Sequence, residues 1–178
     1  MDYTNERRAS RRKHDLKMSI ERVRKYFEEM GIADKIMELP ESSATVELAA
    51  QALGCTPERI AKTISFYDED GVILIVAAGD AKIDNKRFKE HFGLKAKMLS
   101  FEDAEKLIGH AVGGVCPFAV NDGVKVYLDE SLKRFETVFP ACGSSNSAAE
   151  FTCAELEQYA KPVGWADVCK GWRDEEKA

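Results

Sequence analysis

The stretch KTISFYDEDGVILIVAAG, residues 62–79, decides the fold of this chain. Two runs rich in β-branched and aromatic residues flank Asp70 and Gly71, a pair that favours the tight turn of a β-hairpin. The second run, residues 72–78, is apolar throughout, which is typical of a strand buried on both faces. We therefore expect a hairpin at the centre of a sheet.

Helix signals surround this hairpin. An N-capping residue, apolar residues three or four apart and a closing glycine together indicate a helix. These signals predict helices over residues 19–31, 45–54, 56–60, 84–93, 100–109 and 152–160. Short β-rich runs predict strands over residues 35–39, 95–99, 124–130, 137–143 and 148–152. Because hairpins and crossovers are mixed along the chain, we expect a mixed α/β fold rather than a regular βαβ alternation.

The composition of the 178 residues favours one globular domain. Apolar residues make up 44% and charged residues 32%, and the net charge of −5 excludes a globally basic nucleic-acid binder. We find no secretory signal and no apolar run of the roughly 18 residues that span a bilayer. The five cysteines, an odd count without a C-x-x-C pair, predict a reducing cytoplasm rather than a disulfide framework or a zinc site.

The first 17 residues differ from the rest in charge. Their basic residues are Arg7, Arg8, Arg11, Arg12, Lys13 and Lys17, against the acids Asp2, Glu6 and Asp15. We expect a basic N-terminal tail over residues 1–17, either solvated or forming a frayed first helix, followed by a single domain over residues 18–178. A basic arm that touches RNA is the alternative.

Lys62 is the first candidate for chemistry. It lies where the predicted helix over residues 56–60 passes into the first strand of the hairpin. Its neighbours are mostly apolar, so its ammonium can be partly shielded and aimed at the mouth of a cavity, where it would neutralise a phosphate or a developing oxyanion. The alternative is an ordinary lysine at the end of a strand, extended into water.

The second candidate is GHAVGGVCPF, residues 109–118. Gly113 and Gly114 lack Cβ atoms, so a ligand can approach their backbone closely, and their N–H groups can point at it. Pro117 stiffens the exit of the loop. The alternative is a hairpin loop that needs positive φ angles.

The same stretch places Cys116 near His110. A thiol activated by an imidazole can hydrolyse an ester through a thioester. Cysteine is also a common small buried residue, and no orienting acid is evident. Hydrolysis of a small ester or thioester through Cys116 is therefore a separate hypothesis.

Residues 82–97 reverse the sign of an otherwise acidic chain. The segment carries Lys82, Lys86, Arg87, Lys89, Lys95 and Lys97 against Asp84 and Glu90. Such a cluster could meet a phosphate backbone, or it could form a solvated helix face.

Four stretches together resemble the YbaK/EbsC family, the free-standing relatives of the editing domain inserted in bacterial prolyl-tRNA synthetases. They are TVELAAQALGCTPERIAKTISF, VILIVAAGDAKID, GHAVGGVCPF and VYLDESLKRFETVFPACGSSNSAAEFTCAEL, and they run in the family's order over roughly residues 19–160. The resemblance implies a mixed, partly barrel-like sheet surrounded by helices.

The resemblance also implies the location of a site. The family's essential lysine falls on Lys62, and its pocket-bordering G-x-x-x-P loop falls on residues 113–117. With Lys62 as the catalytic residue, the predicted substrate-binding residues are Thr63, Ser43, His110, Gly113, Gly114, Val115, Cys116 and Pro117.

The late part of the resemblance is looser. In ACGSSNSAAEF, Ala141 stands where the family has a serine, and Ala148 stands where it has an acid. Ser144 and Ser145 replace a basic pair, while Glu150 remains as an acid nearby. We expect this side of the pocket to read a different amino acid or a different tRNA end.

The resemblance implies hydrolysis of the ester that joins a wrong amino acid to the 3′ acceptor end of a tRNA. The expected substrate is tRNA for proline carrying alanine, cysteine or another small residue, and prolyl-tRNA synthetase is an expected partner. We expect no cofactor, metal, membrane or DNA. Because no side-chain general base is evident, we expect substrate-assisted hydrolysis in which Lys62 holds the terminal phosphate or the carbonyl oxygen. A non-catalytic tRNA- or protein-binding module of the same fold is the alternative.

Overall fold

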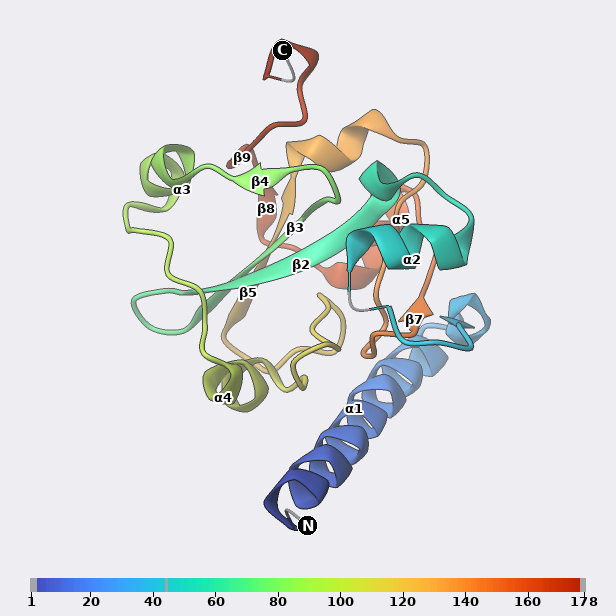
Figure 1. The fold of residues 1–178 in the computed structure, drawn as a ribbon. Helices are drawn as coiled ribbons and strands as arrows, with labels where there is room; N and C mark the ends of the chain where they lie inside the picture. Colours follow the sequence, from blue (N-terminus) through green and yellow to red (C-terminus); the bar gives the residue numbers. More distant parts are fainter. Residues whose placement is uncertain (1–2, 44, 177–178) are drawn as a thin grey trace.

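The computed structural model describes residues 3–43 and 45–176, which build on a five-stranded sheet of order β6-β2-β3-β5-β8 (Figure 1). Strands β2 (Ile60–Tyr67) and β3 (Val72–Ala78) form the antiparallel hairpin at its centre. Every residue of β3 is buried, because neighbouring strands pair with both of its edges and side chains cover both of its faces. The predicted central hairpin is therefore confirmed.

Parallel pairings extend the hairpin on both sides. Strand β5 (Val124–Asp129) runs parallel to β3, and β8 (Gly164–Ala166) runs parallel to β5. On the other side, β6 (Phe139–Pro140) pairs in parallel with the start of β2, where Ile60 faces Phe139. The mixed α/β fold is confirmed. The sheet is open, and no pairing among the described strands joins β6 to β8 to close a barrel.

Two small antiparallel pairs complete the strands. They are β1 (Met37–Glu38) with β7 (Ser147–Ala148), and β4 (Lys82–Ile83) with β9 (Cys169–Lys170). The pairing of β1 with β7 brings the segment before α2 next to the segment after β6. Residues of both segments line a cavity together with the first residues of β2.

Helices cover the sheet and end at the predicted signals. The α-helices are α1 (Tyr3–Glu29), α2 (Val46–Leu53), α3 (Asn85–Phe92), α4 (Phe101–Asp103) and α5 (Cys153–Ala160). Helix α4 continues into a π-helical turn, η3 (Ala104–Ile108), and the 3₁₀ turns are η1 (Ala33–Lys35), η2 (Pro57–Arg59), η4 (Glu130–Arg134) and η5 (Asp174–Glu176). The side chain of Thr45 caps α2, and Thr152 with Glu155 forms a capping box on α5. Among the described residues, no helix combines the length and the apolar character needed to cross a bilayer.

Several strand and helix predictions were wrong in extent. Residues 95–99 do not form a strand and contribute only the single bridge between Phe66 and Met98. The predicted helix over residues 56–60 is one 3₁₀ turn, and the side chain of Thr56 does not cap it. The predicted strands over residues 137–143 and 148–152 shrink to the two-residue strands β6 and β7. The strands β6 and β7 each lie at the edge of their sheet, where side-chain packing and neighbouring loops, rather than local pattern, set the hydrogen bonding.

Helix α1 begins far ahead of the predicted start at Ser19. Its second half packs on the core through buried Val23 and Phe27, and the ring of Phe27 meets that of Phe118 edge-on at 4.9 Å. Its first half extends away from the body (Figure 1), so the described part of the basic segment 1–17 is helical. Residues 1–2 of that segment, and residues 177–178 at the other end, lie outside the described residues.

Candidate active site

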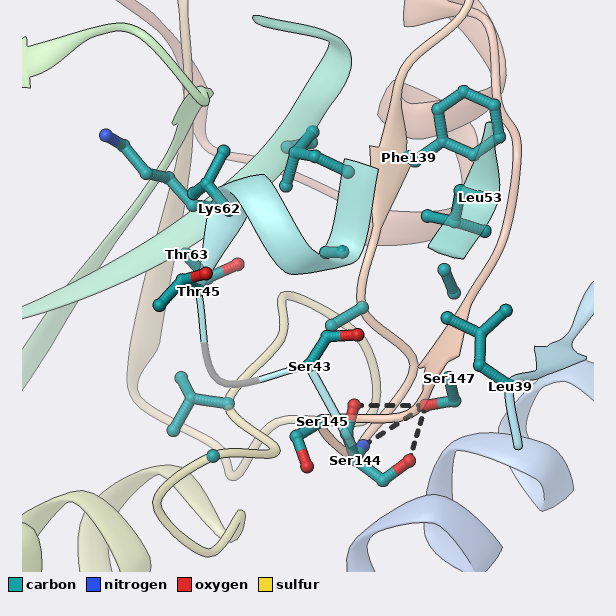
Figure 2. Close-up of a pocket in the computed structure, with 18 residues that line it drawn as sticks. Leu39, Ser43, Thr45, Leu53, Lys62, Thr63, Phe139, Ser144, Ser145 and Ser147 are labelled. Atoms are coloured by element: carbon teal, nitrogen blue, oxygen red, sulfur yellow. Dashed lines mark hydrogen bonds between the residues drawn. The ribbon is translucent and has the colours of Figure 1, made fainter. Parts of the chain in front are cut away.

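A cavity of about 290 Å³ lies beside the first residues of β2 (Figure 2). Helix α2 forms one wall, and the segment from β6 to β7 forms another. Apolar side chains such as Val46, Leu53 and Phe139 line much of it, and hydroxyl groups cluster at one end. A hollow of this character holds a small, mostly apolar group with a few oriented polar atoms.

Lys62 lines this cavity, and its ammonium is anchored at the rim. The Nζ atom donates a hydrogen bond to the carbonyl oxygen of Gly79, 3.2 Å away. Burial lowers the pKa of the ammonium from its usual value. In Figure 2 the side chain points away from the serine cluster. Gly79 must lack a side chain, because a Cβ atom there would lie 2.0 Å from the carbonyl oxygen of Pro57.

The hydroxyl-rich end of the cavity is built by two loops that hold each other. The amide nitrogen of Ser43 donates to the carbonyl oxygen of Ser145 at 2.8 Å, and the two loops also join between Leu39 and Asn146. The Ser147 hydroxyl accepts from the amide of Ser144 at 3.2 Å and donates to the Ser144 carbonyl oxygen at 3.2 Å. The side chain of Ser147 is thus held in place by the backbone of Ser144.

The glycine loop also reaches this cavity. Gly113 and Val115 line the cavity, and Gly113 has a φ of +95°, a conformation that favours glycine. The amide of Gly114 is already used, because it donates to the carbonyl oxygen of Ala111 at 2.9 Å. Within residues 3–43 and 45–176, the amides of Gly113 and Val115 have no hydrogen-bond partner. Those two amides are therefore available to a ligand.

His110 and Cys116 lie behind the loop, fully buried. The Nε2 atom of His110 lies 2.7 Å from the carbonyl oxygen of Phe118, which can only accept, so Nε2 carries the proton. Burial lowers the pKa of His110 and raises the pKa of the Cys116 thiol to about 12. The Sγ atom is 3.7 Å from that protonated Nε2, an arrangement that cannot take the thiol proton.

The structure brings together five of the predicted site residues. Lys62, Thr63, Ser43, Gly113 and Val115 all line the cavity. The remaining predicted residues, Gly114, His110, Cys116 and Pro117, do not line it.

Sequence analysis gave no site role to two polar residues of the wall, Thr45 and Ser147, and it placed Ser144 and Ser145 at the altered side of the pocket without naming their contacts. The run SSNS within residues 141–150 was the available signal, since several hydroxyls between small residues favour a tight polar loop. Lys62 is the single ionisable side chain among the described lining residues. In the part of the chain that the structure describes, no group of three His, Cys, Asp or Glu side chains is placed to hold a metal ion.

Comparison with known proteins relates the chain to tRNA editing. Residues 40–159 match the model of the aminoacyl-tRNA editing domain. The uncharacterised protein YwhH of Bacillus subtilis (strain 168) is 53% identical over 156 residues, which cover 87% of this chain and 99% of YwhH. The proline–tRNA ligase of Thermotoga neapolitana is 30% identical over 127 residues, 70% of this chain, but the match spans only 21% of that ligase.

A solved structure extends the comparison to the fold. The crystal structure of a candidate trans-editing enzyme for prolyl-tRNA synthetase superposes with a TM-score of 0.78 and 31% sequence identity, covering 86% of this chain and 98% of that one. The motifs, the fold and these matches agree, so the YbaK-like resemblance is confirmed: the chain belongs to the aminoacyl-tRNA editing domain family.

Proposed function

We propose that this protein is a trans-editing hydrolase that removes a wrong amino acid from the 3′ end of a tRNA. The observation that supports it most is that Lys62 and Gly113, 51 positions apart, line one cavity. The proposed substrate is tRNA for proline carrying alanine, cysteine or another small residue. We place the activity in the cytoplasm, with prolyl-tRNA synthetase as the source of the mischarged tRNA.

The cavity supports a small aminoacyl group. Its volume of about 290 Å³ and its apolar walls suit a short side chain, and the hydroxyls of Ser43 and Ser145 offer partners for an α-amino group or a polar side-chain atom. Apolar walls discriminate one methylene by only about 1–3 kcal/mol, so recognition of the tRNA has to supply the remaining selectivity.

Hydrolysis needs an oriented water and relief of charge on the carbonyl oxygen. Water attacks the ester carbon, the bond from that carbon to the ribose oxygen breaks, and the ribose oxygen takes up a proton. The proposed donors to the carbonyl oxygen, as it becomes negative, are the amides of Gly113 and Val115, because both residues line the cavity and neither amide has a hydrogen-bond partner among the described residues. The neighbouring ribose hydroxyl orients the water, because the described lining offers no side chain that acts as a base at neutral pH.

Lys62 has to change partner for this role. Its ammonium leaves the carbonyl oxygen of Gly79 and binds the terminal phosphate or the ester carbonyl of the substrate. Where the new acceptor is the phosphate, exchange of a neutral acceptor for an anionic one strengthens the hydrogen bond and substrate binding can drive the movement; at the ester carbonyl, the bond strengthens only as negative charge develops on the oxygen. Thr63 and Ser43 then serve as additional polar contacts on the cavity wall.

A non-catalytic module that holds a tRNA end remains the second candidate. It is favoured by the anchoring of the Lys62 ammonium on a protein carbonyl and by a cavity lining without a side-chain base. The two candidates differ in turnover, not in binding.

A panel of mischarged tRNAs tests both candidates. Wild-type protein, Lys62→Ala and the matched control Lys89→Ala, an exposed lysine of α3, are each incubated with tRNA for proline carrying alanine, cysteine or serine. We expect the wild type and Lys89→Ala to release at least one of these amino acids, and Lys62→Ala to release none while keeping its melting temperature. Binding without release by the wild type would establish the module instead. A folded and fully active Lys62→Ala variant would refute the role of this lysine.

A further inference from the structure

The first half of α1 carries a concentration of positive charge that the cavity does not use. Within residues 5–17, six exposed cations face two carboxylates, which gives a net charge of +4 in a chain of net charge −5. Among the described residues, none of these six cations forms an ion pair with an acid. They are Arg7, Arg8, Arg11, Arg12, Lys13 and Lys17. We call this segment, residues 5–17, the basic arm.

The other basic segment, residues 82–97, is arranged differently. Arg87 pairs with Asp84 and with Asp167, and Lys86 pairs with Glu90. This segment also packs through Phe88 on Phe66, near the end of β2 farther from Lys62. Its charge is therefore partly neutralised, whereas that of the basic arm is open to a partner.

The basic arm leaves the body beside the walls of the cavity. The hydroxyl of Ser19 accepts a hydrogen bond from the amide of Ala111 at 3.1 Å, two residues before Gly113. The backbone of Ser19 also contacts Gly143, directly before Ser144, so closely that a Cβ atom on Gly143 would lie 2.5 Å from the Ser19 carbonyl oxygen. The loop that contains Gly113 and the loop that contains Ser144 therefore both contact α1 at Ser19.

Two adjoining surface hollows lie along α1 from Ser19 into the basic arm. The outer hollow is lined by Arg8, Arg11 and Arg12, and it shares Asp15 and Glu105 with the inner hollow. The inner hollow reaches Ser19 and Ala111. At about 1.5 Å of rise per residue, the cations of the arm are spread from about 3 Å to about 18 Å from Ser19 along the helix axis.

We propose that the basic arm binds the sugar-phosphate backbone of the RNA whose 3′ end enters the cavity. This proposal rests on the proposed function for the identity of the RNA. Cations spread along a helix match the regular charge of an RNA strand, and arginine forms bidentate contacts with phosphate. An anionic membrane would require an apolar face as well, and the sequence of the arm holds only two apolar residues, Ala9 and Leu16. The family model begins at residue 40, so this contact is additional to the editing domain itself.

Binding of an uncharged tRNA, which carries no ester, tests the arm independently of hydrolysis. Fluorescence anisotropy over a series of salt concentrations compares wild-type full-length protein with the triple variant Arg8→Gln, Arg11→Gln and Arg12→Gln. The matched control Lys89→Gln, Lys95→Gln and Lys170→Gln removes the same charge from exposed lysines elsewhere. We expect the arm variant to bind at least about tenfold more weakly at low salt and to reduce the slope of log K against log salt by about 2–3, with little change in the control.

The outcomes separate the arm from the active site. Equal affinity and slope for the arm variant and the wild type would overturn the proposal, as would an equal loss in the control. A second triple variant with lysine at positions 8, 11 and 12 keeps the charge and should restore the slope, and circular dichroism shows that each variant remains helical. Arm-dependent binding to phosphatidylserine vesicles with unchanged RNA binding would replace RNA by a membrane. If the wild type hydrolyses nothing but loses RNA binding in the arm variant, the proposed function fails while the arm's role holds.

Discussion

The ammonium of Lys62 and the carbonyl oxygen of Gly79 lie 3.2 Å apart and form a hydrogen bond at the rim of the candidate active site. Lys62 pairs with Ala77 across the β2-β3 hairpin, so the acceptor follows two residues after its partner in the register. The hairpin turns the side chain of Lys62 toward the end of β3. A half-buried lysine with a single neutral acceptor is poised to exchange that acceptor for an anion.

The lowered pKa of Lys62 predicts the pH dependence of deacylation. Burial is its main cause, so the ammonium loses its proton below the usual pKa of 10.5. If the cation holds the substrate, kcat/KM should fall as pH rises through this lowered pKa. Lys62→Arg, if active, should keep its charge and move the alkaline limb to higher pH. Rates are measured after subtraction of uncatalysed ester hydrolysis, and an identical limb in both proteins would contradict the assignment.

The same pKa shift predicts how stability changes with pH. Between the lowered pKa of the folded protein and the ordinary pKa of the unfolded chain, the unfolded chain binds more protons at Lys62. The free energy of unfolding therefore rises with pH in that window, which lies below pH 10.5. Relative to Lys62→Met, the wild type should gain stability in urea denaturation as pH rises toward 10.5. A constant difference between the two proteins would show that burial does not penalise this charge.

Gly113→Ala should damage both the fold and the site. A φ of +95° is unfavourable for alanine, and we expect a loss of about 1–2 kcal/mol of unfolding free energy. Because Gly113 lines the cavity, deacylation should fall as well. Gly123→Ala is the matched control, since Gly123 has a φ of +86° and open space around its Cβ position, and it is not part of the cavity wall. Equal activities of the two variants would remove the loop from the mechanism.

Cys116→Ala should remain active. The thiol is fully buried, its pKa is raised to about 12, and its neighbour His110 presents a protonated nitrogen. We expect kcat/KM within about threefold of the wild type, with a loss of roughly 1–2 kcal/mol in stability from the smaller side chain. Iodoacetamide should leave the native enzyme active. Loss of activity in a folded Cys116→Ala variant would revive a thioester mechanism.

Ser147→Ala should destabilise the wall of the cavity. Its buried hydroxyl accepts from the amide of Ser144 and donates to the Ser144 carbonyl oxygen. Loss of the hydroxyl leaves the Ser144 amide without its partner, at a cost of about 1–3 kcal/mol, while the Ser144 carbonyl oxygen still accepts from the Ser147 amide at 3.5 Å. The control is Ser42→Ala, whose hydroxyl meets that of Ser145 on an exposed surface and should matter little. Thermal unfolding of both variants provides the comparison.

The elements with strong local signals were predictable from sequence. The Asp70-Gly71 turn lies between β2 and β3, α2 begins after Thr45, and Gly54 and Gly93 end their helices in the left-handed conformation. Each of these features depends on two to four adjacent residues. Strands β4, β8 and β9 were missed because two or three residues carry too little periodicity to be recognised.

The site was predicted only in part, for a related reason. Lys62, Thr63 and Gly113 were identified by type and order, but no local pattern tells which side of a loop faces a cavity. His110 and Cys116 belong to the same loop, residues 109–118, but both side chains are buried in the core. Sequence analysis placed Ser43, Ser144 and Ser145 at the pocket, but it did not predict that the loop at Ser43 contacts the loop at Ser145, because the two loops are about a hundred residues apart.

The candidate active site exists only when distant parts of the chain meet. Asn146 binds Leu39 across 107 positions, and β6 pairs with the start of β2. At synthesis rates of roughly 5–20 residues per second, the ribosome makes the later wall about 5–20 s after the earlier one. A nascent chain that already carries Lys62 therefore has no hollow in which to use it. An mRNA truncated before the codon for Ser147 would encode the β2-β3 hairpin with Lys62, but not the complete wall of the cavity.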